Sequence, residues 1–153
     1  MVTISLCMIV KNEERVLGRC LESVQEIADE IIIVDTGSED RTKEIAEKYH
    51  ARVFEQEWQD DFSRARNYSF SHAEMDYCMW LDADDIITKS EALKLKRWKE
   101  ETDESSDVIM LRYVAEFDEK RNPTLVYYRE RIVKRDKDFQ WQGRVHEAIA
   151  VRG

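Results

Sequence analysis

The sequence predicts a three-layer α/β domain with a mainly parallel central sheet and antiparallel strands near its C-terminal end. Short apolar runs alternate with segments whose apolar residues recur at helical spacing. Polar residues close each run, and from Asp107 onward the pattern changes to alternating strands. Strand and helix in regular alternation are typical of a parallel sheet covered by helices on both faces.

The first half of the chain supplies four of the expected strands and three of the expected helices. Strands are expected at 3–10, 31–34, 52–55 and 77–81, and helices at about 16–24, 39–49 and 61–73. Glu39 and Asp40 lie where a helix N-terminus favours negative charge. The run 77–81 is apolar on both faces, so it belongs in the centre of the sheet.

The second half begins with a helix and continues as strands. Thr88 and Glu91 have the spacing of a capping box, which predicts a helix that runs through Trp98. Strands then flank a turn at Asn122-Pro123. The 153 residues, 42% of them hydrophobic, suit one domain, 1–153, with a nucleotide-binding half at 1–88 and an acceptor-side half at 89–153.

Charge and composition exclude several classes of protein. The chain carries 33 acidic and 24 basic residues, a net charge of −9, without the clustered basic stripe that nucleic-acid binding requires. The only glycines are Gly18, Gly37, Gly143 and Gly153, so the sequence contains neither a G-x-G-x-x-G dinucleotide-binding fingerprint nor a P-loop. The cysteines, Cys7, Cys20 and Cys78, lie within apolar patterns and are expected to be buried thiols.

The chain is expected to be cytoplasmic, either free or peripheral to the inner face of the membrane. Its longest apolar runs, 6–10 and 31–34, are far too short for a transmembrane segment. The N-terminus has neither the basic flank nor the cleavage site of a signal peptide.

Polar residues crowd the predicted carboxyl ends of three strands, where ligands bind in sheets of this kind. The first strand ends in Lys-Asn-Glu at 11–13, the second in Asp-Thr-Gly-Ser at 35–38, and the central one in Asp-Ala-Asp-Asp at 82–85. Asp82 and Asp84 have i, i+2 spacing, which points both carboxylates to the same side of extended chain. A cation would relieve their repulsion, and Mg²⁺ or Mn²⁺ also takes phosphate oxygens. The pair therefore predicts a metal-bound pyrophosphate; the alternative is a solvated turn whose aspartates cap the following segment.

Four motifs in this order resemble the inverting family 2 glycosyltransferases of the GT-A fold. They are K-N-E-E after the first strand, I-I-I-V-D-T-G-S at 31–38, D-F-S-x-A-R-N at 61–67 and W-L-D-A-D-D at 80–85. The W-x-G-x-V-H-E segment at 141–147 resembles the ending of bacterial members. The resemblance covers nearly the whole chain.

The resemblance implies a role for individual residues. It places the base and ribose of a nucleotide beside Val10, Asn12 and Asp35, with Asp82 near the ribose. It makes Asp84 the metal ligand, with His146 as a further metal or diphosphate contact. It also places Arg64, Arg66 and Asn67 near the diphosphate, and it makes Glu147 the candidate base, with Asp85 in reserve. Asp35 as a turn residue, Arg64 on a solvated helix face and His146 as a structural residue are the alternatives.

The resulting hypothesis is an enzyme, a metal-dependent hexosyltransferase that uses Mn²⁺ or Mg²⁺. It would move a sugar with inversion from a nucleotide diphosphate donor, a UDP-sugar, to a glycan, lipid-linked saccharide or peptide acceptor. A non-catalytic nucleotide-sugar-binding fragment is the alternative, because the chain has no Q-x-x-R-W motif and stops at Gly153 as if truncated. Apolar surface left by a missing segment could be covered by a second copy, as a homodimer. A sugar nucleotidyltransferase would need a glycine-rich loop after the first strand, where this chain has K-N-E-E.

Overall fold

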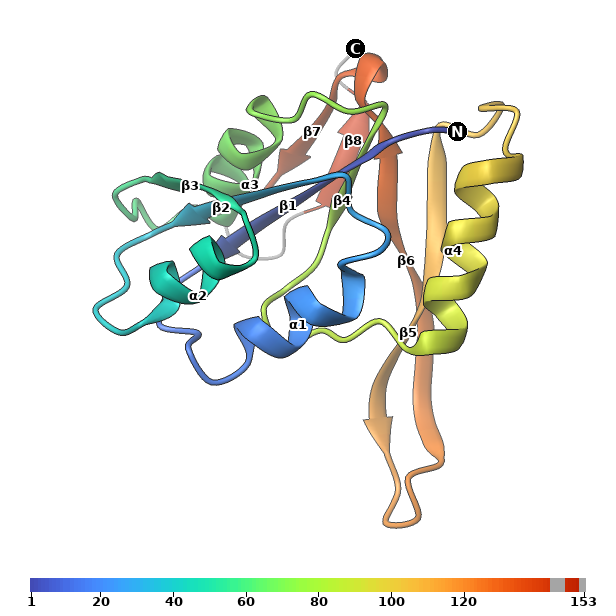
Figure 1. Ribbon diagram of the computed structural model, residues 1–153, viewed down its shortest axis with the longest axis horizontal. Helices are drawn as coiled ribbons and strands as arrows, with labels where there is room; N and C mark the ends of the chain where they lie inside the picture. The colour runs from blue at the N-terminus through green and yellow to red at the C-terminus, as the bar shows by residue number, and fades with distance from the viewer. Residues whose placement is uncertain (144–147, 152–153) are drawn as a thin grey trace.

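The computed structural model describes residues 1–143 and 148–151, and within them one large sheet organises the chain (Figure 1). The strand order is β3-β2-β1-β4-β6-β5, and a separate pair is formed by β7 and β8. The strands are β1 (Ile4–Val10), β2 (Glu30–Asp35), β3 (Arg52–Glu55), β4 (Tyr77–Trp80), β5 (Val108–Phe117), β6 (Pro123–Lys134), β7 (Phe139–Gln142) and β8 (Ala148–Val151). β1 pairs in parallel with β2 and β4, and β2 with β3, whereas β6 runs antiparallel to both β4 and β5.

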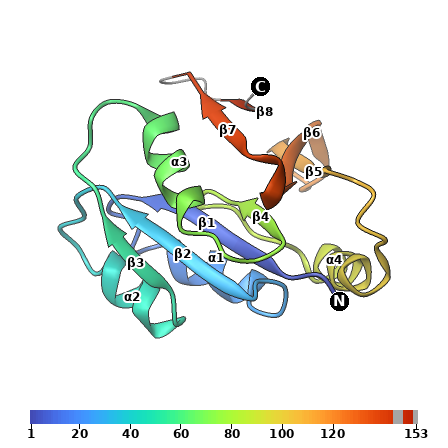
Figure 2. The same ribbon diagram turned by 90° about the horizontal axis from the view of Figure 1, so that it is seen from above.

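Helices cover both faces of the sheet, which confirms the expected three layers (Figure 2). The helices are α1 (Leu17–Val24), α2 (Thr42–Lys48), α3 (Phe62–Ser71) and α4 (Lys89–Glu101), and a 3₁₀ turn covers Arg135–Lys137. α1, α2 and α4 lie on one face, and α3 with β7 and β8 lies on the other (Figure 2). The mainly parallel sheet with the antiparallel strands β5 and β6 at one side is the α/β architecture that the sequence predicts.

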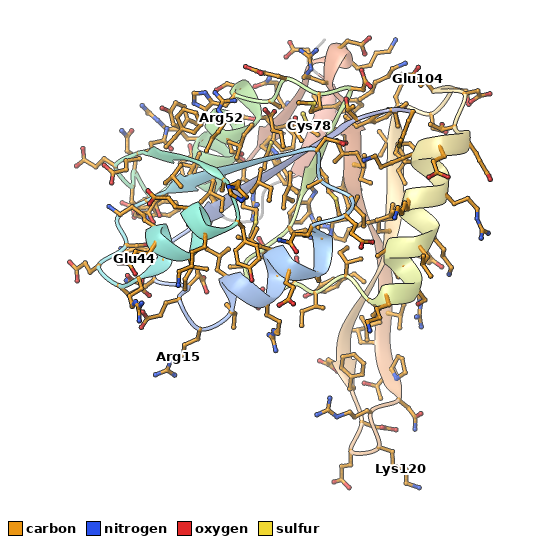
Figure 3. All side chains as sticks on the ribbon, viewed as in Figure 1. Arg15, Glu44, Arg52, Cys78, Glu104 and Lys120 are labelled. Carbon is orange, nitrogen blue, oxygen red and sulfur yellow. The ribbon has the colours of Figure 1, made fainter. Side chains whose placement is uncertain are left out.

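The larger core lies between the sheet and the layer formed by α1, α2 and α4. Leu6 and Met8 of β1 are fully buried there against Leu17 and Leu21 of α1. Each fully buried side chain of this size stabilises the fold by about 1.5–3 kcal/mol. A smaller core on the α3 face includes Cys78, which Figure 3 shows within the body of the molecule. All three cysteines are free and buried, as expected.

The predicted elements agree with the structure except near some ends. The third strand has the expected bounds, and β4 is buried at every residue between two neighbouring strands. Thr88 caps α4, because its Oγ1 accepts a hydrogen bond from the Glu91 amide at 3.3 Å. The helix expected from about 39 begins only at Thr42, because Asp40 Oδ1 accepts from the Thr42 amide at 2.9 Å. Residues 38–40 instead belong to a loop that contacts the end of β1.

The hairpin formed by β5 and β6 extends well beyond the rest of the molecule, with Lys120 at its tip (Figures 1 and 3). Its far end carries exposed apolar side chains, among them Phe117, Leu125 and Tyr128. Within the described residues, no helix has the length and apolar character needed to cross a membrane.

Candidate active site at the carboxyl ends of the strands

Two adjoining hollows lie at the carboxyl ends of the parallel strands. The larger, of about 570 Å³, is lined by Ile9, Val10, Lys11, Glu13, Thr36, Trp58, Phe62, Arg66, Asp82, Ala83 and Asp84. The smaller, of about 470 Å³, is lined by Asp35, Thr36, Gly37, Ser38, Lys43, Glu55, Gln56, Glu57 and Trp58. Thr36 and Trp58 belong to both linings, so the two hollows adjoin. This is the edge where ligands are expected in an α/β sheet.

The loops that follow β1 and β2 are tied together around Asn12. The Asn12 amide donates to Ser38 Oγ at 2.9 Å, and the Glu39 amide donates to Asn12 Oδ1 at 2.8 Å. Asn12 has a φ of 53°, a left-handed conformation that asparagine tolerates better than most residues. Thr36 returns to the end of β1, where its amide donates to the Val10 carbonyl at 3.0 Å. These contacts join the loop after β1 to the turn after β2, whose residues 35–38 line the smaller hollow.

Asp35 has one satisfied and one unsatisfied carboxylate oxygen. Its Oδ1 accepts from the amides of Gly37 and Ser38 at 2.9 and 2.7 Å, and these bonds close the turn after β2. Its Oδ2 is buried and has no hydrogen-bond partner within the described part of the chain. Asp35 therefore closes the turn with one carboxylate oxygen and keeps a second, buried acceptor oxygen, and the residue lines the smaller hollow. A role as a turn residue and a role as a nucleoside contact are compatible.

The aspartates after β4 form a turn that closes on itself. The Asp82 amide donates to Asp85 Oδ2 at 2.8 Å, and the Asp85 amide donates to the Asp82 carbonyl at 3.0 Å. Asp82 and Asp84 both line the larger hollow, and Asp84 is exposed, but they lie in a turn rather than in the extended chain on which the i, i+2 argument depended. Asp85 does not line this hollow. Its carboxylate binds the Arg131 guanidinium at 2.9 Å, a position that does not favour the reserve role of a base.

Glu13 is a site residue to which the sequence interpretation gave no role. It lines the larger hollow, and its amide donates to Thr42 Oγ1 at 2.8 Å. Burial raises the pKa of the Glu13 carboxyl above its usual range, and repulsion from Asp84 and then from Asp82 raises it further. The three carboxylates therefore share one electrostatic environment. The signal in the sequence was the K-N-E-E motif, in which only Asn12 received a role.

The three residues of α3 that were predicted near the diphosphate, Arg64, Arg66 and Asn67, lie in three different positions. Arg66 lines the larger hollow and is only 6% exposed. Its guanidinium lies 2.9 Å from Asp82 Oδ1 and 4.9 Å from the ring centres of both Trp80 and Trp141. Arg64 is exposed and lines neither hollow.

Asn67 also lines neither hollow, and its side chain instead binds the backbone of β7. Asn67 Oδ1 accepts from the Trp141 amide at 2.6 Å, and its Nδ2 donates to the Trp141 carbonyl at 3.0 Å. The structure thus brings one residue of the motif, Arg66, to the predicted diphosphate region. His146 and Glu147 lie outside the described residues.

No three His, Cys, Asp or Glu side chains among residues 1–143 and 148–151 form a ready-made metal site. Magnesium and manganese often bind through only one or two protein carboxylates and complete their shell with water and phosphate oxygens. The exposed Asp84 carboxylate, with Glu13 and Asp82 close enough to affect each other's charge, fits that kind of binding.

Solved structures of S. aureus TarS resemble this fold. TarS in complex with UDP has a TM-score of 0.58 at 26% identity, over 69% of this chain and 34% of that one. TarS in complex with UDP-GlcNAc has a TM-score of 0.59 at the same identity, over 69% and 33% of the two chains.

Comparison with other sequences identifies the family. A TPR repeat-containing protein of Synechococcus elongatus is 37% identical over 150 residues, 97% of this chain and 36% of that protein. LpsC of Rhizobium meliloti, a lipopolysaccharide core biosynthesis glycosyltransferase, is 29% identical over 98% of this chain and 58% of its own length. Both relatives therefore extend well beyond the segment that they share with this chain. The family model described as glycosyl transferase family 2 matches residues 5–151. The chain belongs to glycosyl transferase family 2.

Proposed function

We propose that this chain forms the donor site of an inverting glycosyltransferase that uses a UDP-sugar and a divalent cation. The observation that carries the proposal is the pair of adjoining hollows, one with a buried acceptor on Asp35 and the other with an exposed carboxylate on Asp84. A nucleotide diphosphate sugar has a nucleoside with donor groups at one end and a metal-binding diphosphate in the middle, which matches this order.

Asp35 is proposed to bind the nucleoside. A buried carboxylate oxygen without a partner is costly, and an N–H of the base or a ribose hydroxyl would satisfy it. Val10 lines the larger hollow, and Asn12, which lines neither hollow, binds Ser38 in the turn after β2; both stay proposed nucleoside contacts on the family resemblance. The likeness to TarS, which was crystallised with UDP and with UDP-GlcNAc, supports uridine as the nucleoside.

The charges of the larger hollow support a divalent cation. Among its lining residues, the carboxylates of Glu13, Asp82 and Asp84 outnumber the two cationic groups of Lys11 and Arg66. A diphosphate would add negative charge to a region that is already negative. Mn²⁺ or Mg²⁺ on Asp84 would reverse that balance, and when bound it would offset the charge that develops on the departing diphosphate.

The chain's own residues have separate proposed tasks. Asp84 would hold the cation, with His146 as a proposed second contact, and Arg66 would fix Asp82 while bringing positive charge to the hollow. Glu147 remains the proposed base, which takes the proton from the acceptor hydroxyl as that oxygen attacks the anomeric carbon opposite the diphosphate. Residues 89–153 are proposed to face the acceptor, a glycan, lipid-linked saccharide or peptide.

Titration calorimetry with UDP tests the donor site, with and without Mn²⁺. We expect binding that requires Mn²⁺, and we expect Asp84→Asn to abolish it while the melting temperature is unchanged. Asp107→Asn is the matched control, because Asp107 is exposed and lines neither hollow. Equal UDP affinity of Asp84→Asn and the control would refute the assignment of Asp84.

Product analysis with a panel of nucleotide sugars distinguishes a glycosyltransferase from a nucleotide-sugar-binding protein and from a sugar nucleotidyltransferase. UDP release from one donor, faster with Mn²⁺, is the expected result. Binding without turnover would restrict the chain to a nucleotide-sugar-binding role. Release of pyrophosphate from a nucleoside triphosphate and a sugar phosphate would indicate a nucleotidyltransferase instead.

A further inference from the structure

Arg131 lies far from the donor-site motifs in the sequence and directly behind the aspartate turn in the structure. β6 runs antiparallel to β4 with Met79 opposite Ile132, so the same register places Arg131 beside Trp80, the last residue of β4. Arg131 is 5% exposed, and its guanidinium lies 4.0 Å from the centre of the Trp80 ring. Its position is therefore set by the sheet.

The carboxylate that Arg131 binds is the one that closes the turn. Asp85 Oδ2 accepts from Arg131 Nη1 at 2.9 Å and also from the Asp82 amide at 2.8 Å. A single oxygen thus connects the buried guanidinium to the backbone of Asp82. Rotation of the Asp85 side chain would break both bonds, and Arg131 opposes that rotation.

Two buried arginines hold two of the three aspartates in the turn. Arg66 binds Asp82 and Arg131 binds Asp85, and both guanidinium groups lie against the Trp80 ring. The ring is itself held by a 2.6 Å hydrogen bond from Trp80 Nε1 to the Glu130 carbonyl. Asp84 remains as the exposed carboxylate of the turn, at the larger hollow.

We propose that Arg131 is a positioning residue of the donor site, which fixes through Asp85 the turn that presents Asp82 and Asp84. The inference rests on the proposed function, because the turn is a donor-site element only if the hollow binds a nucleotide sugar. Partners of this kind, one shell behind a metal ligand, typically change metal affinity or activity by about 10–100-fold when they are removed.

Arg129 provides a matched control on the same strand. Its guanidinium also lies near the Trp80 ring, at 5.0 Å, and it pairs with Glu130 at 3.4 Å rather than with an aspartate of the turn. It lines neither hollow. Arg129→Met therefore removes a cation from the same indole without removing a bond to Asp85.

The experiment compares Arg131→Met, Arg131→Lys, Asp85→Ala and Arg129→Met by two measurements. The first is hydrogen exchange of the Asp82 amide in the ligand-free protein, and the second is the affinity for UDP at saturating Mn²⁺. For Arg131→Met we expect exchange at least about tenfold faster and affinity about 10–100-fold weaker. Arg131→Lys should fall between Arg131→Met and the wild type because it keeps the charge but not the planar fork, and Arg129→Met should match the wild type.

The double variant Arg131→Met with Asp85→Ala tests whether the two residues act through one contact. We expect its UDP affinity to match that of the weaker single variant, because the second change removes nothing further. Two independent losses that multiply would overturn the proposed route through Asp85. If Arg131→Met does not fold, Asp85→Ala decides by the same two measurements against Arg129→Met.

Two negative results are distinguishable. A wild-type chain that binds no UDP overturns the donor site and this inference with it. A wild-type chain that binds UDP, with Arg131→Met or Asp85→Ala folded and unchanged in both exchange and affinity, overturns this inference alone.

Discussion

Replacing Asn67 by alanine tests whether this residue holds the fold together or binds the nucleotide. Both polar groups of the Asn67 amide are used on the backbone of Trp141, at 2.6 and 3.0 Å. Trp141 pairs with Ile149 of β8, and because its N–H and C=O point to Asn67 they point away from that neighbour. Asn67 therefore attaches β7 to α3.

The expected loss of stability follows from these two bonds. Trp141 is 3% exposed, so water has little access to the backbone groups that Asn67→Ala would leave unpaired. An unsatisfied buried polar group costs about 1–3 kcal/mol, which gives about 2–4 kcal/mol for the pair when partial hydration is allowed for. In a domain of this size such a loss lowers the melting temperature by about 5–15 °C.

Urea unfolding monitored by tryptophan fluorescence measures this loss. Ser71→Ala on the same helix is the control, because the exposed Ser71 hydroxyl donates only to the Tyr68 carbonyl among the described residues. We expect the control to change the unfolding free energy by less than about 0.5 kcal/mol. Asn67→Ala with unchanged stability and lost UDP affinity would refute the structural role and restore the direct diphosphate contact.

Three further predictions concern titratable groups. Asp35→Asn keeps the oxygen that accepts from Gly37 and Ser38 but replaces the unpaired acceptor, so calorimetry should show UDP affinity about 10–100-fold weaker with the melting temperature nearly unchanged. The raised pKa of Glu13 disfavours its charged form in the folded state, so its contribution makes the unfolding free energy fall as pH rises above the ordinary value of 4.5. Glu13→Gln should remove that fall in urea titrations between about pH 4 and pH 7, and an unchanged slope would refute it. Burial, followed by repulsion from the aspartate turn, raises the pKa of the Cys20 thiol to about 12, so a thiol reagent at about pH 8 should modify it only after unfolding.

The parallel half of the sheet could be predicted because the positions of its strands follow from the runs of buried apolar residues in the sequence. β2 is buried on both faces from Ile31 to Asp35, and such a strand appears in the sequence as an unbroken apolar run. The polar residues that follow each run then lie at one edge by topology, which is why the sequence alone was enough to place Asp82 and Asp84 at the hollow beside the carboxyl ends of the strands.

The partners of the site residues could not be predicted, because they depend on contacts distant in sequence. Ser38 Oγ accepts from the Asn12 amide and Asn12 Oδ1 accepts from the Glu39 amide, and these contacts hold Ser38 and Glu39 in a loop before α2. Asn67 has the same local pattern whether its amide faces a ligand or the backbone of β7. Only the packing of β7 on α3 distinguishes the two.

The antiparallel strands change what the net charge of the chain implies about its ligand. From composition, a charge of −9 implied that an anionic ligand would need a metal, with the arginines of α3 as additional positive charge. The structure shows Arg66 bound to Asp82 and Arg131 bound to Asp85, so each buried cation already faces a carboxylate. The register of β6, which no local pattern predicts, therefore strengthens the case for a cation at Asp84. Because Arg66 faces Asp82 and Arg131 faces Asp85, the exposed Asp84 is the aspartate of this turn that we propose to hold a metal against the diphosphate.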